Sequence, residues 1–366
     1  MRSDAPDTRP VMRAPPFDPG RLGRWLEWRL PGFRGLRTAH RVIGGNSNPI
    51  WRIDADSGRY VLRTQPAGQL LKSAHALDRE YRVLSALAAS PVPVPRVHLL
   101  CDDLDVIGVQ FYLMDFVDGE VHRDMTLRAC APALRTPVYE AAIDALAAVH
   151  RCDVDALGLR DFGRPGDYFA RQLHRWTQQY RTATPEGIPA VDRLLEALAR
   201  STPPPDTPAV LLHGDSRLDN LMFTPGTAEV AAVVDWELST LGHPLADLGQ
   251  FLAVQRLSHD YLLPGLAGVD RVAAGLPSER AQAARYFDAV GGDPDTDLRF
   301  CQAFALFRQA AMAAGLLRRA LDGTAVTEQA LAFGRTAHVF AEVGLRVLED
   351  RKSTRLNSSH AGLSRM

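Results

Sequence analysis

The fold of this chain is decided by two short stretches: His213-Gly214-Asp215-Ser216-Arg217-Leu218-Asp219-Asn220, and then Val233-Val234-Asp235-Trp236-Glu237. Asp215 and Asn220 are five residues apart, and Asp235 follows Asp215 by twenty. Apolar runs at 209–212, 221–223 and 230–234 have the length and composition of short strands, and 224–227 has the Pro-Gly composition of a turn. We therefore expect Asp215 and Asn220 on a loop, with Asp235 ending the second arm of a hairpin beside it.

These residue types, at this spacing, are typical of phosphoryl transfer by kinases. One carboxylate orients the attacking hydroxyl, while an amide and a second carboxylate hold Mg²⁺ against the nucleotide phosphates. Asp215 is the candidate for the first role, and Asn220 and Asp235 are the candidate metal ligands, because a hairpin lets residues twenty apart share one ion. His213 is expected to orient the loop. The alternative is an ordinary solvated turn, and the simultaneous match of all three groups argues against it.

Further motifs follow one another along the chain: Tyr60-Val61-Leu62-Arg63, Leu70-Leu71, Ser73-Ala74-His75, Arg79-Glu80-Tyr81-Arg82-Val83-Leu84, Val92-Pro93-Val94-Pro95-Arg96, Asp161-Phe162-Gly163-Arg164-Pro165-Gly166 and Leu238-Ser239-Thr240-Leu241-Gly242. Together with the first two stretches, they resemble the aminoglycoside phosphotransferase and choline kinase superfamily, distant relatives of protein kinases, over roughly residues 36 to 347. The likeness is closer to the branch fused to, or encoded near, acyl-CoA dehydrogenases. It implies an α+β, bilobal protein-kinase-like fold, with a small antiparallel-sheet N-lobe, a mostly helical C-lobe, and ATP and Mg²⁺ as cofactors.

Composition sets limits on the class of protein. The 366 residues, 46% of them hydrophobic, can bury one large core or two lobes. A net charge of -1 gives no indication of a nucleic-acid or membrane partner. No uninterrupted apolar run reaches the ~18 residues of a membrane span, and no signal-peptide region is recognisable, so we expect a cytoplasmic protein. The four cysteines, without a C-x-x-C pair, argue against a structural zinc site or a disulfide scaffold: Cys101, Cys130, Cys152 and Cys301.

The sequence divides into four segments. Residues 1–20 are predicted to be a disordered leader, 21–118 an N-terminal nucleotide-binding lobe, 119–350 a helical catalytic and substrate lobe, and 351–366 a non-native tail rich in Ser, Arg and Asn. In the first lobe, strands are predicted within 38–65, around a turn at 54–58, and at 94–100 and 109–116, with an amphipathic helix at 74–89. In the second lobe, helices are predicted at 137–150, 167–183, 188–200, 245–257, 294–320 and 325–350. The ATP cleft is expected at the boundary between the lobes.

The phosphates are expected to meet a glycine loop made of Gly44, Gly45, Asn46, Ser47 and Asn48. It lies between two predicted strands, where small side chains let backbone N–H groups approach a phosphate. The alternative is a plain hairpin turn. Arg63 occupies the strand position where protein kinases have lysine, and Glu80 on the following helix is placed to orient it. Lys72, one of two lysines in the chain, is the alternative to Arg63.

The remaining candidates support these groups. Backbone atoms of Met114, Asp115, Phe116 and Val117 are expected to hydrogen-bond adenine at the lobe junction. Supporting roles around the catalytic loop are assigned to Arg217 and Glu237, and the resemblance implies that Asp247 also supports this loop. The family usually has Asp in place of His243 and often Phe in place of Ser216, a loss of packing that could loosen the loop. We interpret Asp161-Phe162-Gly163 as a helix-entry turn, because it precedes the catalytic loop.

The resemblance implies transfer of the ATP γ-phosphoryl group to an acceptor hydroxyl. Its branch favours a hydroxyacyl-CoA or a hydroxy acid, with a functional link to an acyl-CoA dehydrogenase. The alternatives are an aminoglycoside or choline-type kinase and, in another class, a nucleotide-binding pseudokinase or interaction module. Several residues of the helical lobe could meet an anionic substrate or could simply pack or face solvent: Arg175, Trp176, Tyr180, Arg308, Arg318 and Arg319.

Overall fold

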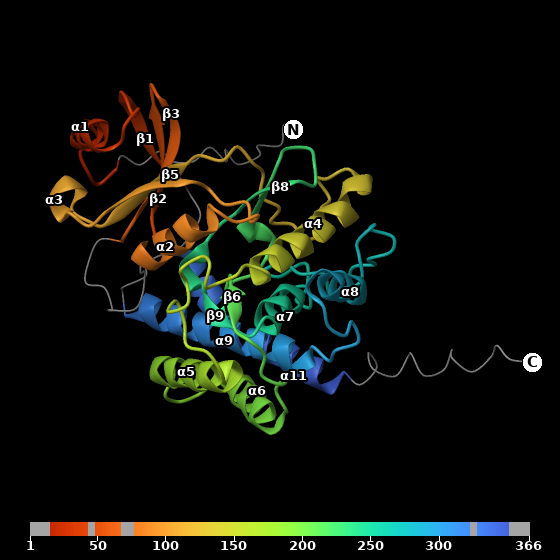
Figure 1. Ribbon diagram of the computed structural model, residues 1–366. Helices are drawn as coiled ribbons and strands as arrows, with labels where there is room; N and C mark the ends of the chain where they lie inside the picture. Colours follow the sequence, from red (N-terminus) through yellow and green to blue (C-terminus); the bar gives the residue numbers. More distant parts are fainter. Residues whose placement is uncertain (1–14, 43–47, 67–76, 323–327, 351–366) are drawn as a thin grey trace, which may run out of the picture. The chain divides into compact units, whose positions relative to one another are not determined.

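The computed structural model describes residues 15–42, 48–66, 77–322 and 328–350 (Figure 1). The chain forms two compact units, Met1–Asp118 and Gly119–Met366. Several sequence predictions fall wholly or partly outside the described residues: the leader up to residue 14, the glycine loop from Gly44 to Ser47, the alternative phosphate ligand Lys72, the starts of the helices predicted at 74–89 and 325–350, and the tail at 351–366.

The first unit is built on an antiparallel sheet of five strands in the order β1-β2-β3-β5-β4. A tight turn joins β2 to β3, and β5 is paired on both sides, so it is the central support for the residues that follow it. The predicted antiparallel N-terminal sheet is confirmed. The strands are β1 Leu36–Val42, β2 Ile50–Ala55, β3 Gly58–Thr64, β4 Val97–Cys101 and β5 Phe111–Asp115.

Three helices accompany this sheet: α1 Pro19–Arg29, α2 Leu77–Leu87 and α3 Leu104–Ile107. Helix α1 was not predicted from the sequence, and its first residues, Pro19 and Gly20, were wrongly assigned to a disordered leader. The helix begins there because the Asp18 side chain accepts a hydrogen bond from Gly20 N at 2.8 Å and proline suits the first helical turn. Leu22 and Leu26, four residues apart on one face, are then fully buried in the sheet's core.

The second unit is mostly helical, as predicted, and α9 is its central element: it contacts α5, α6, α7, α10 and α11. Helix α8 was not predicted. The helix predicted at 325–350 is divided into α10 and α11 at Arg335 and Thr336, where Thr336 Oγ1 donates to Phe333 C=O at 2.6 Å. The helices are α4 Pro132–His150, α5 Tyr168–Ala183, α6 Pro189–Arg200, α7 Leu245–Val254, α8 Glu279–Val290, α9 Arg299–Leu321, α10 Glu328–Gly334 and α11 Ala337–Glu349.

Helix α9 is the one helix in the described part of the chain that is long and apolar enough to cross a membrane. However, 78% of its apolar window is buried inside the structure. A core helix passes the same test of length and composition, so α9 is weak evidence for a membrane span.

Two short strand pairs carry the catalytic residues. Strand β7 Leu221–Phe223 pairs antiparallel with β8 Val230–Val233, which confirms the predicted hairpin. Strand β6 Val210–Leu212 pairs with β9 Thr240–Gly242, which was not predicted. Two 3-10 turns, η1 Leu218–Asn220 and η2 Trp236–Leu238, connect these strands. Both predicted functional stretches therefore follow a strand of this small system.

We predict that Leu26→Ala lowers the free energy of unfolding of the first unit by about 2–5 kcal/mol, because it opens a cavity under α1. Trp28→Ala, in the same helix, should change it by less than about 0.5 kcal/mol, because Trp28 is 78% exposed. Urea denaturation of the two variants measures both values. Equal effects of the two substitutions would show that α1 does not pack on the sheet.

Candidate active site

The catalytic loop turns sharply directly after β6. Gly214 has φ +85°, and a Cβ placed on it would lie 2.2 Å from Leu238 C=O. Any side chain would collide with that backbone, so the turn requires glycine. The consequence is that Asp215 leaves the strand end in a direction fixed by the backbone.

The Asp215 carboxylate is held by three neighbours. The Asn220 Nδ2 group donates to Asp215 C=O at 2.8 Å and to its carboxylate at 3.3 Å. Gln250 Nε2 lies 3.4 Å from the other carboxylate oxygen, and Arg217 Nε lies 3.7 Å away. The side chain of Asp215 is still 16% exposed. The carboxylate is therefore both oriented and accessible, as a group that receives a proton from an acceptor hydroxyl must be.

His213 orients the loop, as its hydrogen bonds show. Its Nδ1 accepts from Asp215 N–H at 3.2 Å, and its Nε2 lies 2.9 Å from Val234 C=O. Because the first partner can only donate and the second can only accept, the ring is the neutral tautomer with its proton on Nε2. Both ring nitrogens are used by backbone groups, and the ring also packs against Trp236 with a centroid distance of 4.8 Å.

Asn220 and Asp235 lie at the same end of the β7–β8 hairpin. Val234 N–H donates to Asn220 C=O at 3.0 Å, directly before Asp235. Asp235 has φ 69° and ψ 61°, a left-handed conformation that is uncommon for a residue with a side chain. The buried Trp236, whose Nε1 donates to Val233 C=O at 3.0 Å, fixes this turn. Such strained residues often occur at functional sites.

Asp247 is the anchor of the catalytic loop. Its carboxylate accepts from His213 N–H at 2.7 Å and from Gly214 N–H at 3.0 Å, and His150 Nε2 lies 3.4 Å from it. His150 in turn lies 2.6 Å from the Tyr286 hydroxyl. Burial alone would raise the pKa of the Asp247 carboxyl, but the hydrogen bond and charge of His150 and the charge of the nearby Arg308 hold it below its ordinary value.

Arg308, one of the candidate substrate contacts, instead has a structural role. It is buried on α9, and its guanidinium donates to Gly214 C=O. Tyr180 is likewise buried: its hydroxyl donates to Asp192 at 2.9 Å and accepts from Ile188 N–H. Neither group is therefore placed to meet a substrate.

The four further candidates from the helical lobe, Arg175, Trp176, Arg318 and Arg319, lie at partly or fully exposed helix positions. Arg175 lies over the ring of Trp176, with 5.8 Å between the guanidinium carbon and the ring centroid. Arg318 pairs with Asp322 at 3.0 Å. Arg319 occupies the last turn of α9. These exposed positions provide no argument for substrate binding.

Arg217 and Asp219, both on the catalytic loop, form an ion pair of 2.8 Å. Burial raises the pKa of the Asp219 carboxyl, although the Arg217 charge opposes this shift. Glu237 lies within η2, next to the Asp235 turn. Arg217 therefore links the Asp215 carboxylate to a second carboxylate, that of the half-buried Asp219.

The departure from the family pattern at His243 has a clear structural role. Its Nδ1 accepts from Leu245 N–H at 3.2 Å, and its Nε2 lies 3.0 Å from Pro205 C=O. The ring thus satisfies an unpaired N–H at the start of α7, a task that an aspartate could also perform. Ser216 is buried in the loop.

In the first unit, Arg63 and Glu80 form the predicted pair. Arg63 Nε lies 2.9 Å from the Glu80 carboxylate, and both side chains are almost completely buried. Asn48, the one described residue of the glycine loop, is also buried. The open choice between Arg63 and Lys72 stays a prediction, because Lys72 lies outside the described residues.

Two of the backbone N–H groups in the predicted adenine-binding stretch already have hydrogen-bond partners. Asp115 N–H donates to Arg96 C=O at 2.9 Å, and Phe116 N–H donates to Arg59 C=O at 3.3 Å. These two N–H groups are therefore used within the first unit, so N–H donation to adenine would come from another residue of the stretch. The predicted backbone contacts, which include the carbonyl groups, stay a prediction. Met114 lies within the doubly paired β5. Val117, directly after the strand pairing, is the strongest remaining candidate.

The donors present fit Mg²⁺ better than a metal that needs a complete protein cage. Asn220 uses its NH₂ group on Asp215, which leaves its amide oxygen for a cation. Within the described residues, no group of three or more His, Cys, Asp or Glu side chains is arranged to hold a metal. Mg²⁺ commonly takes one or two protein oxygens and completes its shell with substrate phosphates and water.

Three residues of this site were not identified in their present roles: Gln250, His150 and Arg308. Gln250 carried a usable signal, because it follows Asp247 by three residues on α7 and so shares its helix face. His150 ends α4 and Arg308 interrupts an apolar run in α9. Nothing local in the sequence connects these two to the catalytic loop.

We predict that Asp247→Asn lowers the free energy of unfolding by about 1.5–3 kcal/mol at pH 7, because the loop's N–H groups lose a charged acceptor. Since the folded-state pKa is depressed, this stabilisation is complete above the unfolded value of about 3.9 and is lost as the pH falls below it. Urea titrations between pH 3 and 7 should show the two proteins converging in acid. The matched control is Asp288→Asn, an exposed α8 residue; a pH-independent difference would contradict the assigned role.

Comparison with known proteins identifies close relatives. Mouse acyl-CoA dehydrogenase family member 10 is 37% identical over 360 residues, which are 96% of this chain and 34% of that protein. The chain spans less than half the length of the curated relatives it matches. A crystal structure from Ralstonia eutropha, provisionally named an aminoglycoside phosphotransferase, is 40% identical with a TM-score of 0.80, covering 91% of this chain and 98% of that one.

A more distant structure shares the fold alone. It is a thermostable mutant of aminoglycoside phosphotransferase APH(4)-Ia in complex with ADP and hygromycin B, 14% identical with a TM-score of 0.57, covering 89% of this chain and 98% of that one. The family model described as the phosphotransferase enzyme family matches residues 38–286, which is more than half of the chain. These findings confirm the resemblance and the bilobal kinase-like fold, and the chain belongs to the phosphotransferase enzyme family.

Proposed function

We propose that this protein transfers the γ-phosphoryl group of ATP to the hydroxyl of a small molecule, with Asp215 receiving the hydroxyl proton. The observation that carries the proposal is the Asp215 carboxylate, oriented by Asn220 and Gln250 and yet partly exposed. In the same fold, a solved phosphotransferase holds ADP together with hygromycin B. The family membership supports the reaction class, and the intact set of catalytic side chains argues against a pseudokinase.

The residues of the chain have separate tasks in this reaction. As the acceptor oxygen forms its bond to the γ-phosphorus, its proton passes to Asp215, and the bond from that phosphorus to the bridging oxygen breaks with its electron pair leaving on ADP. Arg63, paired with Glu80, would bind phosphate oxygens through its guanidinium. Asn220 and Asp235 would hold Mg²⁺, which when bound neutralises charge on the phosphate oxygens.

For the acceptor, we propose a hydroxyacyl-CoA or a hydroxy acid. Support comes from the mouse relative, whose name associates a homologous segment with an acyl-CoA dehydrogenase in one longer chain. Such an arrangement suits two enzymes that act on related acyl compounds. Aminoglycosides and choline-type alcohols are the alternatives, and they differ from the proposed acceptor in charge: both are cationic.

We predict that Asp215→Asn lowers Mg²⁺-dependent phosphate transfer by at least ~100-fold, because general-base catalysis contributes about 10²–10⁴-fold. The assay follows label from γ-labelled ATP to 3- and 4-hydroxyacyl-CoAs, choline and kanamycin. Asp288→Asn, an exposed carboxylate change, should keep wild-type activity. ATP binding by the wild type with no transfer to any acceptor would favour a pseudokinase.

We further predict that Asp235→Asn raises the Mg²⁺ concentration needed for half-maximal activity by at least ~10-fold, since the variant loses a charged ligand. A Mg²⁺ titration at saturating ATP measures this value. Glu229→Gln, at the opposite end of the same hairpin and exposed, is the matched control and should leave the titration unchanged. An identical Mg²⁺ dependence in all three proteins would remove Asp235 from the metal site.

A further inference from the structure

A pocket of about 140 Å³ lies beside the catalytic loop in the second unit. The loop residues Arg217, Leu218 and Asp219 form one side of it, and Val254 at the end of α7 forms another. Arg217 belongs to both places, since its Nε is also 3.7 Å from the Asp215 carboxylate. A molecule in this pocket would therefore lie one side chain away from the group that receives the proton.

The wall of the pocket is apolar. Leu262, Leu263 and Pro264, from the segment between α7 and α8, line it together with Met125. Leu262 is 54% exposed, which is unusual for a leucine and leaves apolar surface available at the pocket mouth. This surface suits a ligand with a hydrocarbon portion, because its burial removes apolar area from water on both sides.

The polar side of the pocket has an excess of positive charge. Asp219 is already paired with Arg217 at 2.8 Å, so the two charges largely offset each other. Arg123 is exposed, lies near enough to Asp219 to influence its carboxyl, and lines the same pocket with His122. The charge left over is therefore the Arg123 guanidinium, which favours an anionic group over the ammonium groups of an aminoglycoside or choline.

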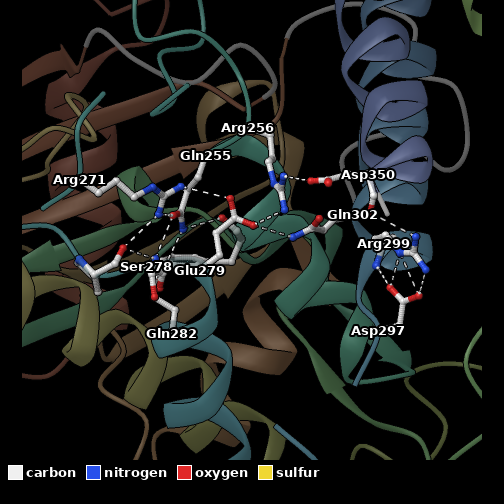
Figure 2. A network of polar contacts seen from close by, with 12 residues as sticks. Gln255, Arg256, Arg271, Ser278, Glu279, Gln282, Asp297, Arg299, Gln302 and Asp350 are labelled. Atoms are coloured by element: carbon white, nitrogen blue, oxygen red, sulfur yellow. Dashed lines mark hydrogen bonds and ion pairs between the residues drawn. The ribbon is translucent and has the colours of Figure 1, made fainter. Parts of the chain in front are cut away.

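The segment between α7 and α8, which carries the apolar wall, is anchored by hydrogen bonds and close backbone packing. Leu266 N–H donates to Gln255 C=O at 2.8 Å, and Gly265 packs so closely that a Cβ would lie 2.3 Å from Leu257 C=O. Figure 2 shows the polar network that continues this anchoring: Arg271 donates to Gln255 at 3.0 Å, and Gln255 and Gln282 exchange hydrogen bonds of 2.8 and 3.0 Å. A wall held in this way is preorganised for binding.

A second layer of ion pairs supports the same segment (Figure 2). Glu279 at the start of α8 binds Arg271 at 3.3 Å and Arg256 at 2.7 Å, and Arg256 also pairs with Asp350 at 3.4 Å. The network thus connects the end of α7, the start of α8 and the end of α11. None of these network residues lines the pocket.

We propose that this pocket is the acceptor subsite: Leu262 and Leu263 receive the apolar body of the acceptor, and Arg123 pairs with its anionic group. The assignment rests on the proposed function for the identity of the reaction. It adds the residues that select the acceptor, and it requires that the hydroxyl approach Asp215 along the Arg217 side of the loop.

The test is calorimetric titration of 4-hydroxyacyl-CoAs with chains of four, six and eight carbons into the full chain. Arg123→Glu and Leu262→Asp should each raise the dissociation constant by about 10-fold or more, because like charge and lost apolar contact both oppose binding. Two matched controls should bind as the wild type does: Val272→Asp, which is 91% exposed in the same segment, and Arg193→Glu on the surface of α6. For a cationic acceptor, Arg123→Glu should instead strengthen binding.

The possible results distinguish a failure of the subsite assignment from a failure of the proposed reaction. Wild-type binding and transfer that persist in both pocket variants would overturn the subsite and leave the phosphotransferase function intact. Binding that is weakened by both pocket variants, in a protein that transfers phosphate to none of the acceptors, would support the ligand site and overturn the reaction. If neither these acyl-CoAs nor choline or kanamycin bind the wild type, the subsite assignment is wrong.

Discussion

The geometry of the catalytic loop depends on one buried carboxylate. Asp247 binds the backbone N–H groups of His213 and Gly214 from α7, and His150 holds it from α4. Arg308 on α9 completes the arrangement by donating to the Gly214 carbonyl. Most side chains of this loop are polar, and its backbone is held by polar and charged groups on three helices of the second unit.

The same interactions explain how groups separated in sequence act together. His213 connects the two functional stretches, because one ring nitrogen binds the Asp215 backbone and the other binds Val234 beside Asp235. The hairpin pairing then places Asn220 at the end where Asp235 emerges. The ends of β6, β7 and β8, together with the His213 imidazole, therefore position the candidate base and both candidate metal ligands.

Much of this could be read from the sequence. The β7–β8 hairpin, the antiparallel sheet and the Arg63–Glu80 pair follow from local patterns, namely alternating apolar residues, turn composition and motif order. The structure departs from prediction where tertiary contacts decide. Helix α1 was not predicted, and Pro19 and Gly20 at its start were assigned to the leader, because no local pattern shows that this segment packs on the sheet. Arg308 was left open between a substrate contact and a packing role, because burial of a charge cannot be seen in a sequence. The sequence also does not show that backbone pairing uses the N–H groups of Asp115 and Phe116.

The polar network around Gln255, Arg271 and Glu279 affects which positions of this sequence can diverge during evolution. It anchors the pocket wall through residues that are distinct from those that anchor the catalytic loop. Substitutions at Leu262 or Leu263 can therefore accumulate with little disturbance of Asp215. A family built in this way can acquire new acceptors while inheriting its chemistry unchanged, and the segment between α7 and α8 is where such divergence should concentrate.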